Sequence, residues 1–519
     1  MKRLAIILPT GSALVKGSRS LAMPTHVFRL LAALPPDVQT RVIDMKMAYG
    51  IPLDTAGEDK VIAAFTADLD RWIEPQRTVI GFSCTSTADI IFALPLARLI
   101  KERYGCYVVM GGYAPSTCYD LLMRHYATWL DGVVLGAGEY PLRVLMEQLE
   151  DGHVAAERVP NLVWRRDGEM VVNPRCTPLP TGELPVLDIS SLPYRHLYPY
   201  IAYNSSVGCP YHCRFCVERD VHPNYEMRPA ELVIADLQRL QELSGLRHIG
   251  FHDPIFGRRP DLRSLLERLN DMGVSYIFQT RVDALDTQWY PLLSHGCRFI
   301  FFGLEGVSPA SLARMNKTPH AEPYLQMLEA QVQHAFAAGI LPVIALLPNY
   351  PLNTRADAEA CVAIARRLRV LHDQSGVQSG LIFTPFQFRI EYGSTHQKEL
   401  PRLMAQGLTV RPYFPPEYRG IPIPAEFMLQ VENASADLTL HDYERAFAEI
   451  MRQSVVQPAQ LAAFARYYVI DLDPFVAGKI VYAPFFTDPD LNVVSVQGLM
   501  REFARYSEIL TAMVDTRFR

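Results

Sequence analysis

Short apolar segments alternate with amphipathic segments along the first 150 residues of the chain. β-Branched and apolar residues dominate five short runs, at residues 3–8, 40–44, 78–83, 107–110 and 131–135. Helix-like stretches lie between these runs, for example at residues 88–103 and 140–150. Alternation of this kind predicts parallel strands joined by right-handed crossovers, and therefore a Rossmann-like open sheet.

A second alternating block begins near residue 200. Six strand-like runs occupy residues 201–207, 248–252, 276–280, 299–303, 341–347 and 381–386. Helical stretches separate them, among them residues 230–243, 323–338 and 355–372. Six βα units in succession predict a partial (β/α)6 barrel, whose active site lies at the carboxyl ends of its strands.

The chain is therefore expected to have an α/β fold in four regions. Residues 1–150 form the Rossmann-like domain, and residues 151–199 form a connector with a β-hairpin around Asp167-Gly168 and a proline-rich stretch. Residues 200–400 form the partial barrel. Residues 401–519 are expected to form a mainly helical domain that caps the barrel mouth and carries substrate specificity.

Composition narrows the class of protein. The 519 residues are long enough for several domains, and 49% hydrophobic residues can fill their cores. A net charge of -5 without long Lys and Arg runs argues against nucleic acid or an anionic membrane as partner. No segment reaches the roughly 18 apolar residues that a membrane span needs. The short apolar start before Pro9 favours a first strand over a signal peptide, so we expect a cytoplasmic protein.

The strongest chemical signal is a cysteine cluster directly after the first strand of the second block. Cys209, Cys213 and Cys216 lie within eight residues, whereas the other six of the nine cysteines are scattered as core residues usually are. Three soft, anionic thiolates can hold one metal centre. A structural zinc site needs four ligands, and no second cysteine or histidine pair completes one. The spacing therefore favours a [4Fe–4S] cluster with one open iron, with zinc as the alternative.

The ends of the first-block strands carry small and hydroxyl-bearing residues. These are Ser83-Cys84-Thr85-Ser86, Gly111-Gly112 and Gly136-Ala137-Gly138-Glu139. Open α/β sheets bind ligands at such strand ends, and glycine lets the backbone approach a bulky ligand. Glycine after a strand is also ordinary turn chemistry, so these residues alone leave ligand binding open.

The cysteine string, with the aromatic Phe215 before its last cysteine, resembles the signature of radical S-adenosylmethionine (radical SAM) enzymes. The resemblance continues at Phe251-His252-Asp253-Pro254-Ile255-Phe256, at Thr280-Arg281-Val282-Asp283 and at Gly303-Leu304-Glu305-Gly306. It covers roughly residues 1 to 395 and is closest to the subgroup with an N-terminal cobalamin-binding domain.

The resemblance implies three cofactors: a [4Fe–4S] cluster on the three cysteines, SAM and cobalamin. It implies SAM contacts from Glu305 and Arg281, with Phe215 and Asp253 in the cofactor site. Cobalamin would contact the strand-end residues Ser83, Thr85, Ser86, Gly111, Gly112, Gly136, Gly138 and Glu139.

The resemblance also implies a reaction. The leading interpretation is a methyltransferase that moves a methyl group from SAM through methylcobalamin to a carbon of a small molecule. A cyclase or rearrangement enzyme, for example one acting on a porphyrin, and non-radical methylation of the tryptophan-methylase type are the alternatives. A non-catalytic iron–sulfur or zinc module would leave the two ligand-binding blocks without a role. The chemistry implies an electron donor such as a flavodoxin or ferredoxin.

Two departures from the subgroup's pattern concern the cofactors. The Asp-x-His-x-x-Gly motif is absent and His26 is the only histidine in the first 120 residues, so we expect neither a protein histidine nor the cofactor's own base on cobalt. Residues 347–351 replace the strand-five Gly-x-Pro-Gly element, which puts SAM contacts from that strand in question.

The sequence does not identify the substrate. Tyr203, Phe388 and Tyr392 are candidate substrate contacts because they lie near predicted strand ends. The aromatic clusters after residue 400 could line an apolar pocket or pack in a core; they are Tyr413-Phe414, Tyr467-Tyr468, Tyr482 and Phe485-Phe486.

Overall fold

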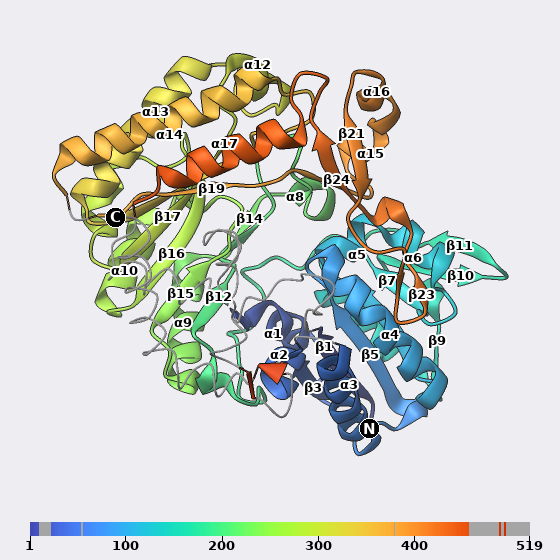
Figure 1. Cartoon of the computed structure of the whole chain (residues 1–519). Coiled ribbons are helices and arrows are strands. Elements are labelled where there is room, and N and C mark those ends of the chain that lie inside the picture. Colours follow the sequence, from blue (N-terminus) through green and yellow to red (C-terminus); the bar gives the residue numbers. More distant parts are fainter. Residues whose placement is uncertain (10–21, 53–54, 378, 456–486, 489–492, 495–519) are drawn as a thin grey trace.

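The computed structural model describes residues 1–9, 22–52, 55–377, 379–455, 487–488 and 493–494. Two seven-stranded sheets dominate these residues, and helices cover their faces (Figure 1). The α/β fold is thereby confirmed, with a Rossmann-like sheet from the first part of the chain and an open barrel from the middle.

The N-terminal sheet has the strand order β11-β10-β7-β6-β5-β1-β3. Its strands are β1 (Arg3–Leu8), β3 (Gln39–Asp44), β5 (Thr78–Ser83), β6 (Tyr107–Gly111), β7 (Gly132–Val134), β10 (Leu162–Arg166) and β11 (Glu169–Val172). The first five are parallel, because helices connect them, and the apolar runs in the sequence are their buried residues. The antiparallel hairpin β10–β11 pairs with β7, so the predicted hairpin extends this sheet.

Besides α1 (Thr25–Ala32), which is described below, the helices of this part of the chain follow the sheet's strands. They are α2 (Met45–Tyr49), α3 (Thr55–Asp70), α4 (Thr87–Tyr104), α5 (Tyr113–Thr117), α6 (Tyr119–His125) and α7 (Glu139–Glu147). Helix α4 begins at a capping box in which Ser86 and Asp89 each accept a hydrogen bond from the other's backbone N–H, which fixes where β5 gives way to the helix.

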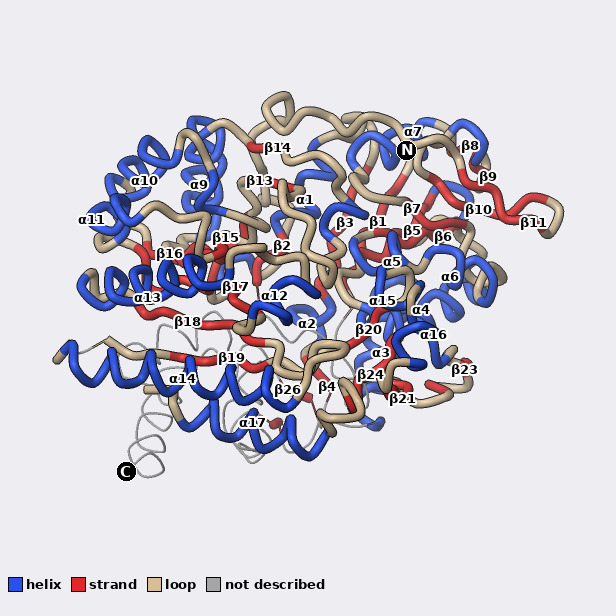
Figure 2. The backbone as a smooth tube through the Cα atoms, turned by 90° about the horizontal axis from the view of Figure 1, so that it is seen from above, coloured by secondary structure: helices blue, strands red, loops and turns tan. Residues whose placement is uncertain are grey.

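The barrel sheet has the order β19-β18-β17-β16-β15-β12-β2, and all of its strands are parallel. The strands are β2 (Ala22–Pro24), β12 (Tyr200–Tyr203), β15 (His248–Phe251), β16 (Ser275–Arg281), β17 (Cys297–Glu305), β18 (Leu341–Leu346) and β19 (Ile382–Pro385). The surrounding helices are α9 (Ala230–Ser244), α10 (Leu262–Asp271), α11 (Tyr290–Leu293), α12 (Pro309–Arg314), α13 (Ala321–Ala337) and α14 (Arg355–Ser375). Figure 2 shows α10, α13 and α14 outside the strands.

Strand β2 joins the two halves of the molecule. It lies in the N-terminal region, yet Ala22–Pro24 pair with Tyr200–Ala202 at the edge of the barrel sheet. Helix α1 (Thr25–Ala32) follows it and packs on both β12 and α7. The predicted partial barrel is present with one more strand than the sequence indicated.

The described part of the C-terminal region combines helices with strands. A three-stranded antiparallel sheet is formed by β20 (Arg389–Glu391), β24 (Met428–Asn433) and β21 (Thr409–Pro412). The helices are α15 (Thr395–Lys398), α16 (Leu400–Ala405) and α17 (Leu440–Arg452). The aromatic clusters at 467–468, 482 and 485–486 lie outside the described residues.

Residues 413–427, here called the strap, connect β21 to β24 and contain the short pair β22 (Glu417–Tyr418) and β23 (Ile421–Pro422). Phe414, Tyr418, Ile421, Ile423 and Phe427 pack into the hydrophobic core of the N-terminal domain. Tyr413-Phe414 therefore belongs to this contact between domains. Among the described residues no helix is both long and apolar enough to cross a membrane.

Candidate active site

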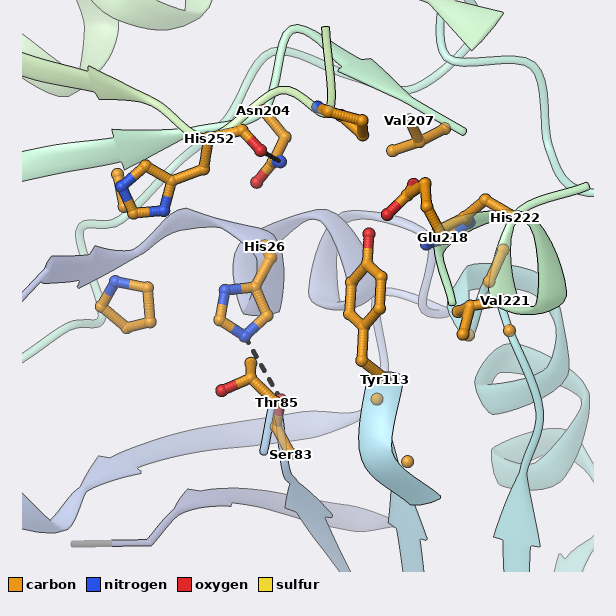
Figure 3. A pocket seen from close by; sticks show the side chains of 18 of the residues that line it. His26, Ser83, Thr85, Tyr113, Asn204, Val207, Glu218, Val221, His222 and His252 are labelled. Atoms are coloured by element: carbon orange, nitrogen blue, oxygen red, sulfur yellow. Dashed lines mark hydrogen bonds between the residues drawn. The ribbon is translucent and has the colours of Figure 1, made fainter. Parts of the chain in front are cut away.

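A cavity of about 670 Å³ lies where the carboxyl ends of the two sheets face each other. Residues that end β1, β5, β6 and β7 form one side, and residues that end β12, β15, β16 and β17 form the other. Figure 3 shows this arrangement, with Ser83 and Thr85 opposite Asn204 and His252. Ligand sites of open sheets and of barrels both lie at this edge, so the cavity is the candidate active site.

All three clustered cysteines line the cavity, and their thiols are free. The segment after α12 anchors their loop, because the Arg214 backbone N–H donates to the Met315 carbonyl at 2.9 Å. Asn316 also donates from Nδ2 to the His212 carbonyl at 2.8 Å. Cys216 is the most exposed of the three cysteines, yet partial desolvation by the surrounding protein raises the pKa of its thiol to about 12. A bound metal would displace that proton, since thiolates are the ligating form.

Two buried carboxylates fix the start of the cysteine loop. Asp253, two residues after β15, accepts hydrogen bonds from the Ser205 N–H at 3.1 Å and from the Ser205 hydroxyl at 2.7 Å. Glu218 accepts the Gly208 N–H at 2.8 Å through Oε1. Gly208 has φ of 71°, and a Cβ there would lie 1.9 Å from the Asn224 carbonyl oxygen, so only glycine fits. Asp253 is absent from the cavity lining and orients the loop from behind.

Arg281, Glu305 and Lys317 form one polar network beside Cys213. Arg281 donates from Nη1 to the Cys213 Sγ at 3.4 Å and from Nη2 to the Lys317 carbonyl at 2.8 Å. The Lys317 ammonium forms an ion pair with the Glu305 carboxylate. All three side chains line the cavity, which places the predicted Glu305 and Arg281 next to the cysteines.

Glu305 ends β17 in an uncommon backbone conformation. Its φ is 58°, and the register between β17 and β18 shifts between Gly303 and Glu305. Such a bulge re-aims a side chain at the end of a strand. Lys317 was not predicted as a site residue, because its contact with Glu305 depends on how α12 packs.

The cysteine loop supplies three sulfur ligands, one fewer than the four of a structural zinc site. In the part of the chain that the structure describes, no three His, Cys, Asp or Glu side chains are grouped to hold one metal ion. Arg281 also forms a bidentate ion pair with Asp283, with both bonds at 2.8 Å, which fixes its guanidinium beside Cys213.

The N-terminal side of the cavity is a glycine-rich edge. Gly112 has φ of 112°, and a Cβ there would lie 2.3 Å from the Cys84 carbonyl oxygen. Ser116 links two of the predicted loops, because its Oγ donates to the Gly112 carbonyl at 2.7 Å and accepts the Gly136 N–H at 2.9 Å. The predicted residues that line this side are Ser83, Thr85, Gly111, Gly112, Gly136, Gly138 and Glu139. Ser86 does not line the cavity and caps α4.

Three histidines line the cavity that were not predicted as site residues: His26, His222 and His252. The His26 Nε2 lies 3.2 Å from the Ser83 Oγ (Figure 3). Burial lowers the pKa of each of the three to about 4, so all are neutral at pH 7. The sequence offered one signal, since His252 stands beside Asp253 at a predicted strand end.

The three candidate substrate contacts lie elsewhere. Tyr203 is fully buried and donates to Asp236 at 2.6 Å. Phe388 packs against Tyr350, and Tyr392 donates to Asp120 at 2.7 Å. None of them lines the cavity. Residues 347–351, which replace the strand-five element, are likewise absent from its lining.

Comparison with known proteins also points to the barrel region that contains the cysteine loop. The model of the radical SAM superfamily matches residues 203–360, which run from β12 into α14 and include the cysteine loop. An uncharacterized methyltransferase of Pyrococcus horikoshii is 25% identical over 394 residues, covering 72% of this chain and 80% of the relative. The cobalamin-dependent radical SAM methyltransferase TokK of Streptomyces tokunonensis is 31% identical over 158 residues, or 28% of this chain and 22% of TokK.

A solved structure is similar over almost the whole chain. The radical S-adenosylmethionine methyltransferase TsrM from Kitasatospora setae, solved with cobalamin and a [4Fe–4S] cluster, superposes with a TM-score of 0.64. The alignment covers 99% of this chain and 100% of TsrM at 16% sequence identity. The two proteins therefore share a fold.

Proposed function

On the premise that the chain is a radical SAM enzyme, with its family domain at residues 203–360, we propose that it is a cobalamin-dependent methyltransferase. It moves a methyl group from SAM, through cobalamin, to a carbon atom of a small molecule. A relative named as a methyltransferase, similar over 72% of this chain, supports this reaction. An anaerobic magnesium-protoporphyrin IX monomethyl ester cyclase of Rubrivivax gelatinosus is 26% identical over 45% of the chain, so cyclisation is the alternative.

One observation carries the proposal. The cysteine loop and the glycine-rich strand ends, which are 70 or more positions apart in sequence, line one continuous cavity. A protein that only held an iron–sulfur cluster or zinc would have no use for a second ligand edge facing the first. A cavity shared by two cofactor sites suits a reaction in which a group passes from one to the other.

The chain's own residues divide the work. When bound, the cluster and cobalamin supply electron transfer to SAM and methyl carriage, respectively. Cys209, Cys213 and Cys216 hold the cluster, while Arg281 and the Glu305–Lys317 pair present fixed charges for the ends of SAM. The backbone at Gly111, Gly112, Gly136 and Gly138 lets a corrin ring approach the sheet edge closely.

The barrel wall away from the cysteines is the proposed substrate site. It presents His252, Gln279 and Phe301 to the cavity. Gln279 donates its amide to the Asp253 carbonyl at 3.0 Å, so it is held in place. The apolar ring of Phe301 and the polar side chains of His252 and Gln279 together suit a small-molecule substrate. A flavodoxin or ferredoxin is the proposed source of electrons.

Product analysis tests the proposal. Protein purified without oxygen and supplied with iron, sulfide and cobalamin is incubated with SAM and reductant, and 5′-deoxyadenosine and S-adenosylhomocysteine are quantified. We expect both products in the wild type, with 5′-deoxyadenosine lost in Cys213→Ala. Cys176→Ala is the matched control, because Cys176 is partly exposed and does not line the cavity.

Other outcomes point elsewhere. 5′-Deoxyadenosine alone would favour cyclisation or rearrangement, and S-adenosylhomocysteine alone would favour non-radical methylation. Zinc in place of iron, with neither product, would contradict the proposal.

A further inference from the structure

One short helix is part of both proposed cofactor sites. Helix α8 (Glu218–Val221) begins two residues after Cys216. Its other end packs against the glycine-rich edge, because a Cβ on Gly136 would lie 3.0 Å from the Val221 carbonyl oxygen. The rings of Tyr113 and His222 are in edge contact, with centroids 5.4 Å apart. The helix therefore links the cysteine loop to the N-terminal sheet.

A chain of polar contacts runs through this helix. The Tyr113 hydroxyl points toward the Glu218 carboxylate (Figure 3), and the same carboxylate accepts the Gly208 N–H at 2.8 Å. The two groups interact electrostatically, because burial raises the pKa of Tyr113 and the Glu218 charge raises it further. Glu218 is only 8% exposed, so water does not replace these contacts freely. Gly208 directly precedes Cys209, which makes the carboxylate a fixed point for the first cluster ligand.

The other end of the chain is equally well anchored. Tyr113 directly follows Gly112, whose carbonyl accepts the Ser116 hydroxyl, and that hydroxyl accepts the Gly136 N–H. A ligand resting on Gly112 and Gly136 would therefore constrain Tyr113. In the same way, a cluster that orders Gly208 and Cys209 would constrain Glu218.

We propose that Tyr113 and Glu218 are positioning residues that couple the two cofactor sites. This inference rests on the proposed function, since it needs cobalamin at the glycine-rich edge and a cluster on the cysteines. Occupation of either site orders the contact between Tyr113 and Glu218 and so favours binding at the other site. The effect is equal in both directions, because coupling between two sites is reciprocal.

Binding measurements on the full chain test the coupling. The dissociation constant of hydroxocobalamin is measured by absorbance titration without oxygen, for protein with and without its reconstituted cluster. We expect the cluster to tighten cobalamin binding about tenfold, within the range of typical coupling between sites. In Tyr113→Phe and in Glu218→Gln this difference should fall to less than twofold. The double variant should show no further loss, because both residues take part in the same contact.

A matched control and a second readout separate coupling from general damage. Tyr392→Phe removes the hydrogen bond from the Tyr392 hydroxyl to Asp120 of the N-terminal domain, which lies outside the cavity. This variant should keep the tenfold difference. In the wild type, cobalamin should also change the EPR spectrum of the reduced cluster. This change should be absent in Tyr113→Phe.

The possible results are distinct. Cobalamin binding that is equally tight with and without the cluster would overturn the coupling and leave the proposed function standing. Coupling that persists in both single variants would overturn the role of these two residues. A wild-type protein that binds no cobalamin would overturn the proposed function and this inference together.

Discussion

At the scale of single residues, the candidate site depends most clearly on the buried charge of Lys317. It is 6% exposed and its ammonium pairs with Glu305 in the cavity. Lys317→Met leaves the Glu305 carboxylate without its counter-ion, which costs about 3 kcal/mol for a buried pair. We expect a lower urea midpoint and weaker SAM binding.

The surface pair of Arg366 and Glu449 is the control for Lys317. Arg366 is 61% exposed, so Arg366→Met should cost less than about 1 kcal/mol and leave SAM binding unchanged. Equal destabilisation by the two variants would contradict the buried role of Lys317.

The cavity histidines give the protein a pH dependence. Burial holds the pKa of His252 at about 4 in the folded protein, whereas in an unfolded chain a histidine titrates near 6.5. Between these values the unfolded chain binds the extra proton, so stability decreases as pH falls from about 6.5 to 4. In His252→Gln this part of the loss should disappear. Urea midpoints of both proteins at pH 7.5 and pH 5 check this, and an identical loss in both would contradict it.

Among the residues of this chain, His26 is the one we test as a ligand of a bound cobalt. His26 is the only histidine in the first 120 residues and lines the cavity, but its Nε2 lies within hydrogen-bonding distance of the Ser83 Oγ. We expect the EPR spectrum of the cobalt(II) protein to show no nitrogen superhyperfine splitting. Splitting that vanishes in His26→Ala would contradict this and assign the ligand to His26.

At the scale of elements, two glycines with positive φ differ in what surrounds them. Gly105 ends α4 and a Cβ there meets nothing within 4 Å, whereas at Gly112 it would meet the Cys84 carbonyl. Gly105→Ala should therefore cost about 1 kcal/mol for the left-handed backbone and leave cobalamin binding intact. Gly112→Ala must also move the backbone of the ligand edge, so hydroxocobalamin binding should weaken at least about tenfold, the equivalent of about 1.4 kcal/mol. Similar binding by the two variants would exclude Gly112 from the site.

Elements whose signals are local were predictable from the sequence. The strands of both sheets are short apolar runs that are buried, and the start of α14 is fixed by a capping box at Thr354 and Asp357. Strand β2 was missed because three residues carry no periodicity and its partner β12 lies about 180 positions away. The pairing of the hairpin with β7 was not predicted either, because it joins segments that are not adjacent in sequence.

The candidate site divides along the same line. The cysteines share one loop, so their spacing alone revealed them. Tyr113 and Glu218 are contributed by different domains, and Lys317 reaches Glu305 only after α12 has packed. No pattern within one segment encodes such contacts.

At the scale of the whole molecule, three segments hold the strand-end edges of the two sheets opposite each other. Strand β2 with α1 leaves the N-terminal region to join the barrel sheet, and α8 leaves the barrel to touch the N-terminal edge. The strap places its aromatic residues in the N-terminal core. The cavity exists because these connections fix the separation of the two strand-end edges, so its shape depends on contacts far from its lining.

The strap contact can be weakened through one buried ion pair. Glu58 on α3 is 0% exposed and accepts hydrogen bonds from the Tyr418 hydroxyl at 2.9 Å and from Arg419 at 3.2 Å. Arg419→Ala leaves this carboxylate without its cation, at a cost of about 3 kcal/mol. Local opening should then expose the strap, so limited proteolysis should cut within residues 413–427 sooner than in the wild type. Cobalamin binding should weaken while the iron content stays the same, since the cysteine loop is anchored within the barrel by Met315 and Asp253. Arg445→Ala removes an exposed arginine that lies 3.9 Å from Asp442 and outside the strap, and it should change neither measurement. If the iron content fell together with cobalamin binding, the two sites would depend on the strap equally, and the strap would not act through the N-terminal domain.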